Sequence, residues 1–265
     1  MKILFIGDII GRPGRDTVKK ILPSLKEKYF PDLTIANGEN LTHGRGISEE
    51  TVNDMIRAGV DFFTTGNHVY ANKQGAAKLD DRKFPVIRPA NFPPGNPGRG
   101  FQLFETAKMQ KVLVVNLMGR VFMKHNYDCP FRTIDAILDE HKLDNPEAII
   151  VDIHADATSE KTALAHYLDG RVTAVIGTHT HVPTADSRIL EEGTAYITDV
   201  GMVGLSDSII GVDKEPIIRN FLTQMPVKHE FGDGPTTFNA VLIETEGNTK
   251  KAESIELIIE QSDNS

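Results

Sequence analysis

Metal-ligating side chains follow five short apolar segments of this chain. Seven such residues stand at these segment ends: Asp8, Glu39, Asn40, Asn67, His154, His179 and His181. Carboxylate and amide oxygens combined with imidazole nitrogens, without thiolate, suit Fe, Mn or Zn and suit Ca poorly. The set is too large for one four-coordinate zinc ion, but it is about right for two ions that share a bridging carboxylate. The sequence therefore predicts a dinuclear transition-metal site.

Each of these residues alone also has an ordinary explanation. An aspartate after a strand is usually a turn former or a helix cap. The sharpest single element is His179-Thr180-His181, because residues i and i+2 of an extended backbone point to the same side. His68 directly follows Asn67, so we expect it near the ions, as a general acid rather than as a ligand.

The other histidines and several basic residues have weaker claims. We interpret five histidines as surface or packing groups, although two of them flank site loops and could touch substrate, His43 and His125; the other three are His141, His166 and His229. Arg120, Arg132 and Lys161 could bind phosphate or ribose, but nothing in the sequence distinguishes them from solvated charges. The substrate-binding residues are therefore not assigned at this stage.

Strand-like and helix-like segments alternate along the chain, which predicts an α/β layered fold with a mostly buried sheet. We expect strands at 3–6, 33–36, 62–65, 112–117, 149–153, 174–176 and 196–200. We expect helices at 17–25, kinked or ended by Pro23, and at 48–58, 132–141, 159–168 and 215–222. Segments 238–244 and 252–259 alternate as an antiparallel pair around Gly247-Asn248, and 88–100 is expected to be an irregular loop. Parallel strands would bring the five segment ends to one rim, where α/β sheets bind ligands.

Composition narrows the protein class. The 265 residues are 40% hydrophobic, and no break in composition divides them, so we expect a single domain over 1–265. Cys129 is the only cysteine, so no intramolecular disulfide can form. A net charge of −8 argues against a broad nucleic-acid-binding face. With no signal peptide or membrane span evident, we expect a cytoplasmic protein, with a frayed tail at 261–265.

The ordered motifs resemble those of the calcineurin-like metallophosphoesterases. Their pattern is D-x-H, GDxxD, GNH[DE], a lone H and GHxH. Here Ile10 replaces the first-motif histidine, Glu39 replaces the usual bridging Asp, and Thr178 replaces the usual GH pairing. These departures match a bacterial branch, the YmdB-like metallophosphoesterases, which act on 2′,3′-cyclic nucleotides. Three segments are most similar to that branch: 3–14, 177–186 and 194–201.

This resemblance implies a four-layer αββα sandwich with mixed sheets and two metal ions. It assigns Asp8, Glu39, Asn40 and His181 to one ion, and Glu39, Asn67, His154 and His179 to the other. Glu39 would bridge the ions, and Asn40 would take the place left by the missing first-motif histidine. His68 is similar to the family's catalytic histidine.

The expected function is a phosphodiesterase for 2′,3′-cyclic nucleotides. Two ions, Fe or Mn with Zn possible, would stabilise the phosphoryl charge and generate hydroxide, while His68 protonates the leaving oxygen. Two alternatives remain open: a phosphomonoesterase or protein phosphatase on the same metals, and a regulatory binding protein whose metals only shape a partner surface. The expected partners are a small phosphoester substrate and further copies of the chain in a homo-oligomer.

Overall fold

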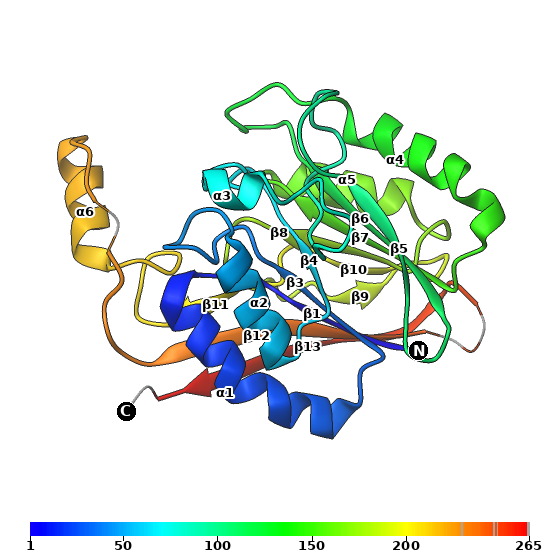
Figure 1. The fold of residues 1–265 in the computed structure, drawn as a ribbon, viewed down its shortest axis with the longest axis horizontal. Helices are drawn as coiled ribbons and strands as arrows, with labels where there is room; N and C mark the ends of the chain where they lie inside the picture. The colour runs from blue at the N-terminus through cyan, green and yellow to red at the C-terminus, as the bar shows by residue number, and fades with distance from the viewer. Residues whose placement is uncertain (229, 246, 248, 264–265) are drawn as a thin grey trace.

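Two mixed β-sheets form the centre of the computed structural model, which describes residues 1–228, 230–245, 247 and 249–263 (Figure 1). The first sheet contains β1 (Lys2–Ile6), β2 (Asp8–Ile9), β3 (Leu33–Asn37), β4 (Phe62–Thr64), β11 (Met202–Leu205), β12 (Thr236–Thr245) and β13 (Ala252–Ser262). The second contains β5 (Phe101–Glu105), β6 (Lys111–Met118), β7 (Ala148–His154), β8 (Ala174–Thr178), β9 (Arg188–Ile189) and β10 (Ala195–Ile197).

Two helices cover the outer face of each sheet, α1 (Gly11–Tyr29) and α2 (Glu49–Ala58) on the first and α4 (Pro130–Glu140) and α5 (Thr158–Tyr167) on the second. The other helices are α3 (Lys73–Ala76) and α6 (Lys214–Thr223), with a 3₁₀ turn at Lys142–Asp144. One hydrophobic cluster joins α1 and α2 to the first sheet, and another joins α4 and α5 to the second. A third cluster lies between the sheets. These three clusters separate four layers, so the predicted αββα sandwich is confirmed.

The strand β1 shows how the sequence produces this layering. Side chains alternate between the two faces of a strand. Leu4 and Ile6 accordingly join the cluster under α1, while Ile3 and Phe5 join the cluster between the sheets. A strand buried on both faces must be apolar throughout, which is why residues 3–6 carry no polar side chain.

The predicted strand ends meet, but they come from two sheets. β1, β3 and β4 are parallel neighbours in the first sheet. β7 and β8 are parallel neighbours in the second. The expected single rim is therefore a junction at which the carboxyl ends of both sheets approach each other.

Several predicted element boundaries need correction. Helix α1 begins at Gly11 and continues through Pro23 to Tyr29, because its apolar face packs on the first sheet and outweighs the one hydrogen bond that a proline removes. β12 and β13 pair antiparallel as expected, although Asn248 of the predicted turn lies outside the described residues. Gln261 and Ser262 belong to β13 and are not frayed, while residues 264–265 are not described. The segment 88–100 contains neither helix nor strand, as predicted.

Helix α6 differs from the other helices. It contains no buried residue, and Figure 1 shows it standing apart from both sheets. Its apolar side chains include Phe221 and Leu222, which are 71% and 79% exposed. Within the described part of the chain, no helix combines the length and the apolar character needed to cross a membrane.

Candidate metal centre

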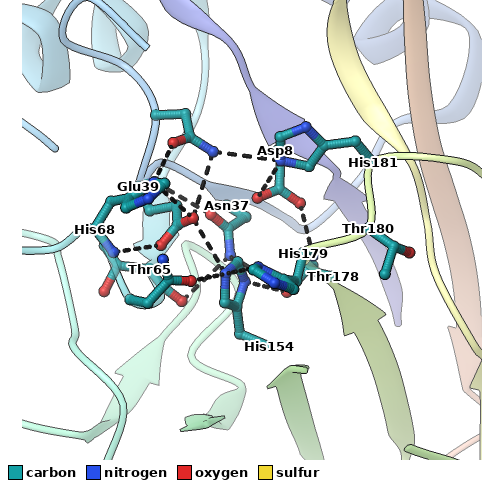
Figure 2. Close-up of polar contacts among 12 residues, drawn as sticks. Asp8, Asn37, Glu39, Thr65, His68, His154, Thr178, His179, Thr180 and His181 are labelled. Atoms are coloured by element: carbon teal, nitrogen blue, oxygen red, sulfur yellow. Dashed lines mark hydrogen bonds and ion pairs between the residues drawn. The ribbon is translucent and has the colours of Figure 1, made fainter. Parts of the chain in front are cut away.

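All seven predicted ligands lie in one contact network at the junction of the two sheets, together with His68. Figure 2 labels Asp8, Glu39, His68 and the three ligand histidines of this network. Asp8, Glu39, Asn40 and Asn67 come from the first sheet or the loops that follow its strands. His154, His179 and His181 come from the ends of β7 and β8 in the second. Below, the Asp8 half means Asp8, Asn40 and His181, and the His154 half means Asn67, His154 and His179.

Glu39 lies between the two halves. Its Oε1 is 3.1 Å from His154 Nε2 and 3.4 Å from Asn40 Nδ2, while its Oε2 accepts the backbone N–H of His68 at 2.9 Å. Its side chain is 1% exposed. A buried carboxylate that touches both halves has the position a bridging ligand needs.

The His154 half is densely packed. His154 Nε2 lies 3.2 Å from Asn67 Oδ1 and 3.0 Å from His179 Nδ1. Ligand atoms of Glu39, His154 and His179 all lie within 4.8 Å of one another. Imidazole nitrogens and carboxylate oxygens facing the same point form a donor set that suits a transition-metal ion.

A buried relay fixes the orientation of the His154 ring. His154 Nδ1 lies 2.8 Å from the Thr178 hydroxyl, which donates to Asp152 Oδ1 at 2.7 Å. Asn37 donates to the other oxygen of Asp152 at 3.1 Å. This arrangement places a proton on Nδ1 and turns Nε2 toward Glu39. Metal-ligating histidines commonly use their second nitrogen in this way.

The close approach of the sheets depends on Gly66. A Cβ atom at this position would lie 2.3 Å from His154 Nε2 and 2.4 Å from Glu39 Oε2. No side chain fits in that space, so the glycine that follows β4 is a requirement of the site rather than of a turn.

The Asp8 half is more loosely connected. His181 Nε2 lies 3.6 Å from Asp8 Oδ1 and 3.5 Å from Asn40 Nδ2. Asp8 is fully buried, yet its Oδ1 has no hydrogen-bond partner among the described residues. An orphaned buried carboxylate oxygen costs free energy, and a bound cation would satisfy it, so the residues present fit a metal ion.

One detail of Asn40 departs from the expected ligand role. Its amide nitrogen faces Glu39 and His181, while its Oδ1 lies 2.9 Å from His68 Nδ1. A metal ligand must present the oxygen, and rotation of the amide by about 180° would exchange the two atoms.

The segment after β8 corrects one sequence expectation. His179 and His181 do not lie on an extended backbone, since their φ angles are 97° and 66°. Side chains larger than glycine rarely adopt such angles. The two histidines therefore reach the site through a strained turn and not through strand alternation.

Two buried carboxylates hold this turn in place. The backbone N–H of His179 donates to Asp8 Oδ2 at 3.3 Å. Asp199 Oδ2 accepts both the N–H and the hydroxyl of Thr180, at 3.0 and 2.7 Å. Lys161 Nζ lies 2.9 Å from the same Asp199 oxygen, and both side chains are fully buried. Lys161, buried and paired with Asp199, therefore supports the turn and is neither a solvated charge nor an exposed group for phosphate or ribose.

The charges of the site are strongly coupled. Burial opposes ionisation of both carboxylates, but His181 lowers the pKa of Asp8, and His154 and His68 hold the pKa of Glu39 well below its usual value. Burial likewise opposes protonation of His154, yet Glu39 and Asp8 raise its pKa to about 9. Burial and the charge of His154 lower the pKa of His179 to about 3. Without metal, the His154 imidazolium thus supplies positive charge to two ionised carboxylates.

The pKa of Asp152 is shifted in the opposite direction from those of Asp8 and Glu39. Burial raises its pKa to about 6. Both of its carboxylate oxygens nevertheless accept a hydrogen bond, one from the Thr178 hydroxyl and one from the Asn37 amide. The sequence carried a signal for this residue, because Asp152 is a charged residue in the apolar strand β7, two positions before His154 and hence on the same face.

His68 touches the site with only one ring nitrogen. Nδ1 lies 2.9 Å from Asn40 Oδ1 and 3.3 Å from Glu39 Oε1, while the side chain is 25% exposed. Nε2 has no hydrogen bond among the described residues, so it is the ring atom available to a substrate.

The remaining candidates lie elsewhere or outside the described residues. Arg132 lines a cavity of about 640 Å³ beside α4, and the residues around this cavity include none of the predicted ligands. Arg120 follows β6, at the start of the segment that carries the exposed His125. His43 lies in the turn after Asn40, His141 pairs with Asp144, and His166 is exposed on α5. His229 is not described.

The chain is similar to known proteins over nearly its whole length. Residues 4–258 match the model of the family described as YmdB-like protein. The chain belongs to the YmdB-like family. A relative of this family from Bacillus subtilis (strain 168), named 2′,3′-cyclic-nucleotide 2′-phosphodiesterase, is 48% identical over 99% of this chain and 98% of its own length. A Mycoplasma pneumoniae relative, named putative phosphatase/phosphodiesterase, is 39% identical over 97% of this chain and 92% of its own.

Solved structures give the same result for the YmdB-like fold. A novel phosphatase from Mycoplasma pneumoniae superposes with a TM-score of 0.92 at 38% identity, covering 99% of this chain and 94% of the other. A hypothetical protein from Thermus thermophilus gives 0.91 at 43% identity, over 98% and 99% of the two chains. The calcineurin-like phosphoesterase YfkN from Bacillus subtilis, at 12% identity, gives 0.59 over 98% of this chain and 90% of the other, which shows the shared fold alone.

Proposed function

We propose that this chain hydrolyses 2′,3′-cyclic nucleotides at a centre that holds two transition-metal ions, with iron or manganese favoured over zinc. The observation that carries the proposal is the buried convergence of Asp8, Glu39 and the three imidazoles around an unsatisfied Asp8 oxygen. The name of the Bacillus subtilis relative supports the choice of substrate. Bound ions of this kind polarise phosphoryl oxygens and lower the pKa of water to about 7.

The chain's own residues supply positioning and a proton. Glu39 holds the two halves together, and the Asp152–Thr178 relay keeps His154 Nε2 directed at the centre. His68 Nε2 faces away from Glu39 and carries the proton for the leaving 2′-oxygen of the ribose. Proton transfer by a positioned side chain typically contributes about 10²–10⁴-fold. The product would be a nucleoside 3′-phosphate.

A substrate panel with metal analysis on the same preparation tests this proposal. Purified protein should contain about two transition-metal ions per chain, and should convert 2′,3′-cyclic nucleotides to 3′-phosphates. A metal content near one ion, unchanged by reconstitution, would contradict the dinuclear site. Faster hydrolysis of phosphomonoesters than of any cyclic nucleotide would favour the second candidate, a phosphatase, which the names of the Mycoplasma relatives leave open.

A further inference from the structure

Three aromatic side chains form a row that begins beside His68. Tyr70 lies in the same turn as His68, whose carbonyl accepts the N–H of Ala71 at 2.8 Å. The ring of Tyr70 lies 5.8 Å from that of Phe92. Phe92 in turn stacks on Tyr127, with centroids 4.8 Å apart and planes inclined by only 5°.

This aromatic row rests on the hydrophobic cluster directly beneath the metal centre. The three rings pack in the same cluster as Leu41 and Val69, the residues that follow Asn40 and His68. Burial and the Glu39 charge together raise the pKa of Tyr127, so its phenol lies within the electric field of the site. The row is thus continuous with the site and not a separate part of the core.

The segment that carries Tyr127 is fixed at both ends. At its start, the N–H of Gly119 donates to the carbonyl of His154 at 3.0 Å. At its base, the buried Asn91 side chain donates to the carbonyls of Met118 and Asp128, at 2.8 and 2.9 Å. Residues 119–128 therefore leave the second sheet next to His154 and return close to their starting point. Tyr127 consequently has a defined position before any substrate binds.

Packing and hydrogen bonding within the fold engage only part of the Tyr127 side chain. Phe92 occupies one face of its ring, but the residue remains partly exposed. Its hydroxyl makes no hydrogen bond to any described residue, and exposed His125 approaches it edge-on at 6.2 Å between centroids. A tyrosine serving only as core would bury its ring and pair its hydroxyl.

We infer that Tyr127, backed by Phe92, is the surface on which the nucleobase of the substrate stacks. This inference rests on the proposed function and adds the substrate part that the ions do not contact. Every nucleobase has a π-face, so stacking tolerates different bases and contributes about 1–3 kcal/mol per base. The site should therefore favour nucleoside cyclic phosphates over base-free ones while discriminating little between purine and pyrimidine.

Two substrates that differ only in the base test this assignment. They are adenosine 2′,3′-cyclic phosphate and 1-O-methylribose 2′,3′-cyclic phosphate. Tyr127→Leu keeps an apolar side chain against Phe92 but removes the aromatic face. It should raise KM for the adenosine substrate about 5- to 150-fold and leave the base-free substrate unaffected. Tyr127→Phe should behave as wild type with both substrates. The matched control is Tyr167→Leu, because Tyr167 on α5 is also partly exposed and also packs against a phenylalanine, Phe131.

A fluorescent variant provides a second measurement that does not depend on Tyr127→Leu folding. The chain contains no tryptophan, so Tyr127→Trp introduces a single reporter that retains an aromatic face. Adenosine 3′-phosphate should quench its emission, and 1-O-methylribose 3-phosphate should not.

The outcomes separate the two proposals. Equal effects of Tyr127→Leu on both substrates, or equal quenching of Tyr127→Trp by both phosphates, would overturn the stacking role while leaving the phosphodiesterase intact. Wild-type protein that hydrolyses neither cyclic phosphate would overturn the proposed function, and this assignment with it.

Discussion

The two halves of the candidate centre differ in how they are supported. His154 lies at the end of a buried strand and has its second nitrogen held by Thr178 and Asp152. His181 lies on a strained turn, and its Nδ1 is 2.9 Å from the backbone carbonyl of Ile210, an exposed residue whose own φ is 48°. Rigid, dry surroundings preserve ligand geometry. The His154 half is therefore better prearranged through His154, although His179 shares the strained turn, whereas the Asp8 half depends more on the ion itself.

The largest expected effect tests whether the halves share a ligand. Glu39→Gln should lose both ions and all measurable turnover, because a neutral amide cannot bridge two cations as a carboxylate does. Asn40→Ala should release mainly the ion of the Asp8 half. Elemental analysis of both variants, prepared in parallel, measures this difference. Equal metal loss in the two variants would show that Glu39 does not bridge.

The next effect concerns a residue that we assign to neither half. His68→Ala should reduce turnover of a 2′,3′-cyclic nucleotide by about 10²–10⁴-fold, since a general acid is lost. Metal content and melting temperature should stay close to wild type, as they should in the surface variant His166→Ala. The defect should shrink with a nitrophenyl phosphodiester, whose leaving group needs little protonation.

Two results would contradict the acid role of His68. An equal loss with both esters would indicate that His68 positions the substrate. Loss of metal from His68→Ala would make it a ligand or the support of one, and the proton would have to come from another group.

A smaller effect probes the support of the His154 half. Asp152→Asn should lower the affinity of that half for its ion by about 10–100-fold, which is the usual consequence of removing a hydrogen-bonding partner of a ligand. The ion of the Asp8 half should be retained. Asp144→Asn is the matched control, because Asp144 pairs with His141 at 2.6 Å outside the centre. If Asp152→Asn releases both ions alike, the two halves do not differ in the way described.

The smallest effect is a pH dependence. Because the His154 pKa is raised to about 9, metal uptake at pH 7 should release its proton, and affinity should rise about tenfold per pH unit up to pH 9. The same raised pKa stabilises the metal-free fold below pH 6.5, and that contribution should disappear as the pH rises through about 9. Calorimetric titrations in buffers of different ionisation enthalpy count the protons. Uptake without proton release at pH 7 would exclude His154 as a ligand.

The residues at strand ends could be predicted because their pattern is local. A polar residue directly after an apolar strand, repeated five times, required only adjacency in the sequence, and the structure brings those residues together. The turn at His179 and His181 could not be predicted in this way, since its backbone angles depend on Asp8 and Asp199, which are distant in the chain. The role of Lys161 could not be predicted for the same reason, because nothing near it in the sequence indicates its pairing with Asp199.

The single domain over 1–265, the cytoplasmic location and the homo-oligomer stay predictions, as do the individual ligand roles and the identity of the metals. Helix α6, with no buried residue and an exposed Phe221, is a feature that an oligomer would explain.

The division of the ligands between two sheets has a mechanical consequence. Each sheet is held by its own ladder of backbone hydrogen bonds, and no strand of the described chain pairs from one sheet to the other. Between the sheets lie an apolar cluster, whose packing is non-directional, and a few side-chain hydrogen bonds at the junction, such as that from Asn37 to Asp152. Ions gripped by Asp8 and Glu39 on one side and by three histidines on the other would pin the two sheets against shear. Binding of the ions would then make the whole sandwich more rigid, so the ions would also stabilise the packing of one sheet on the other.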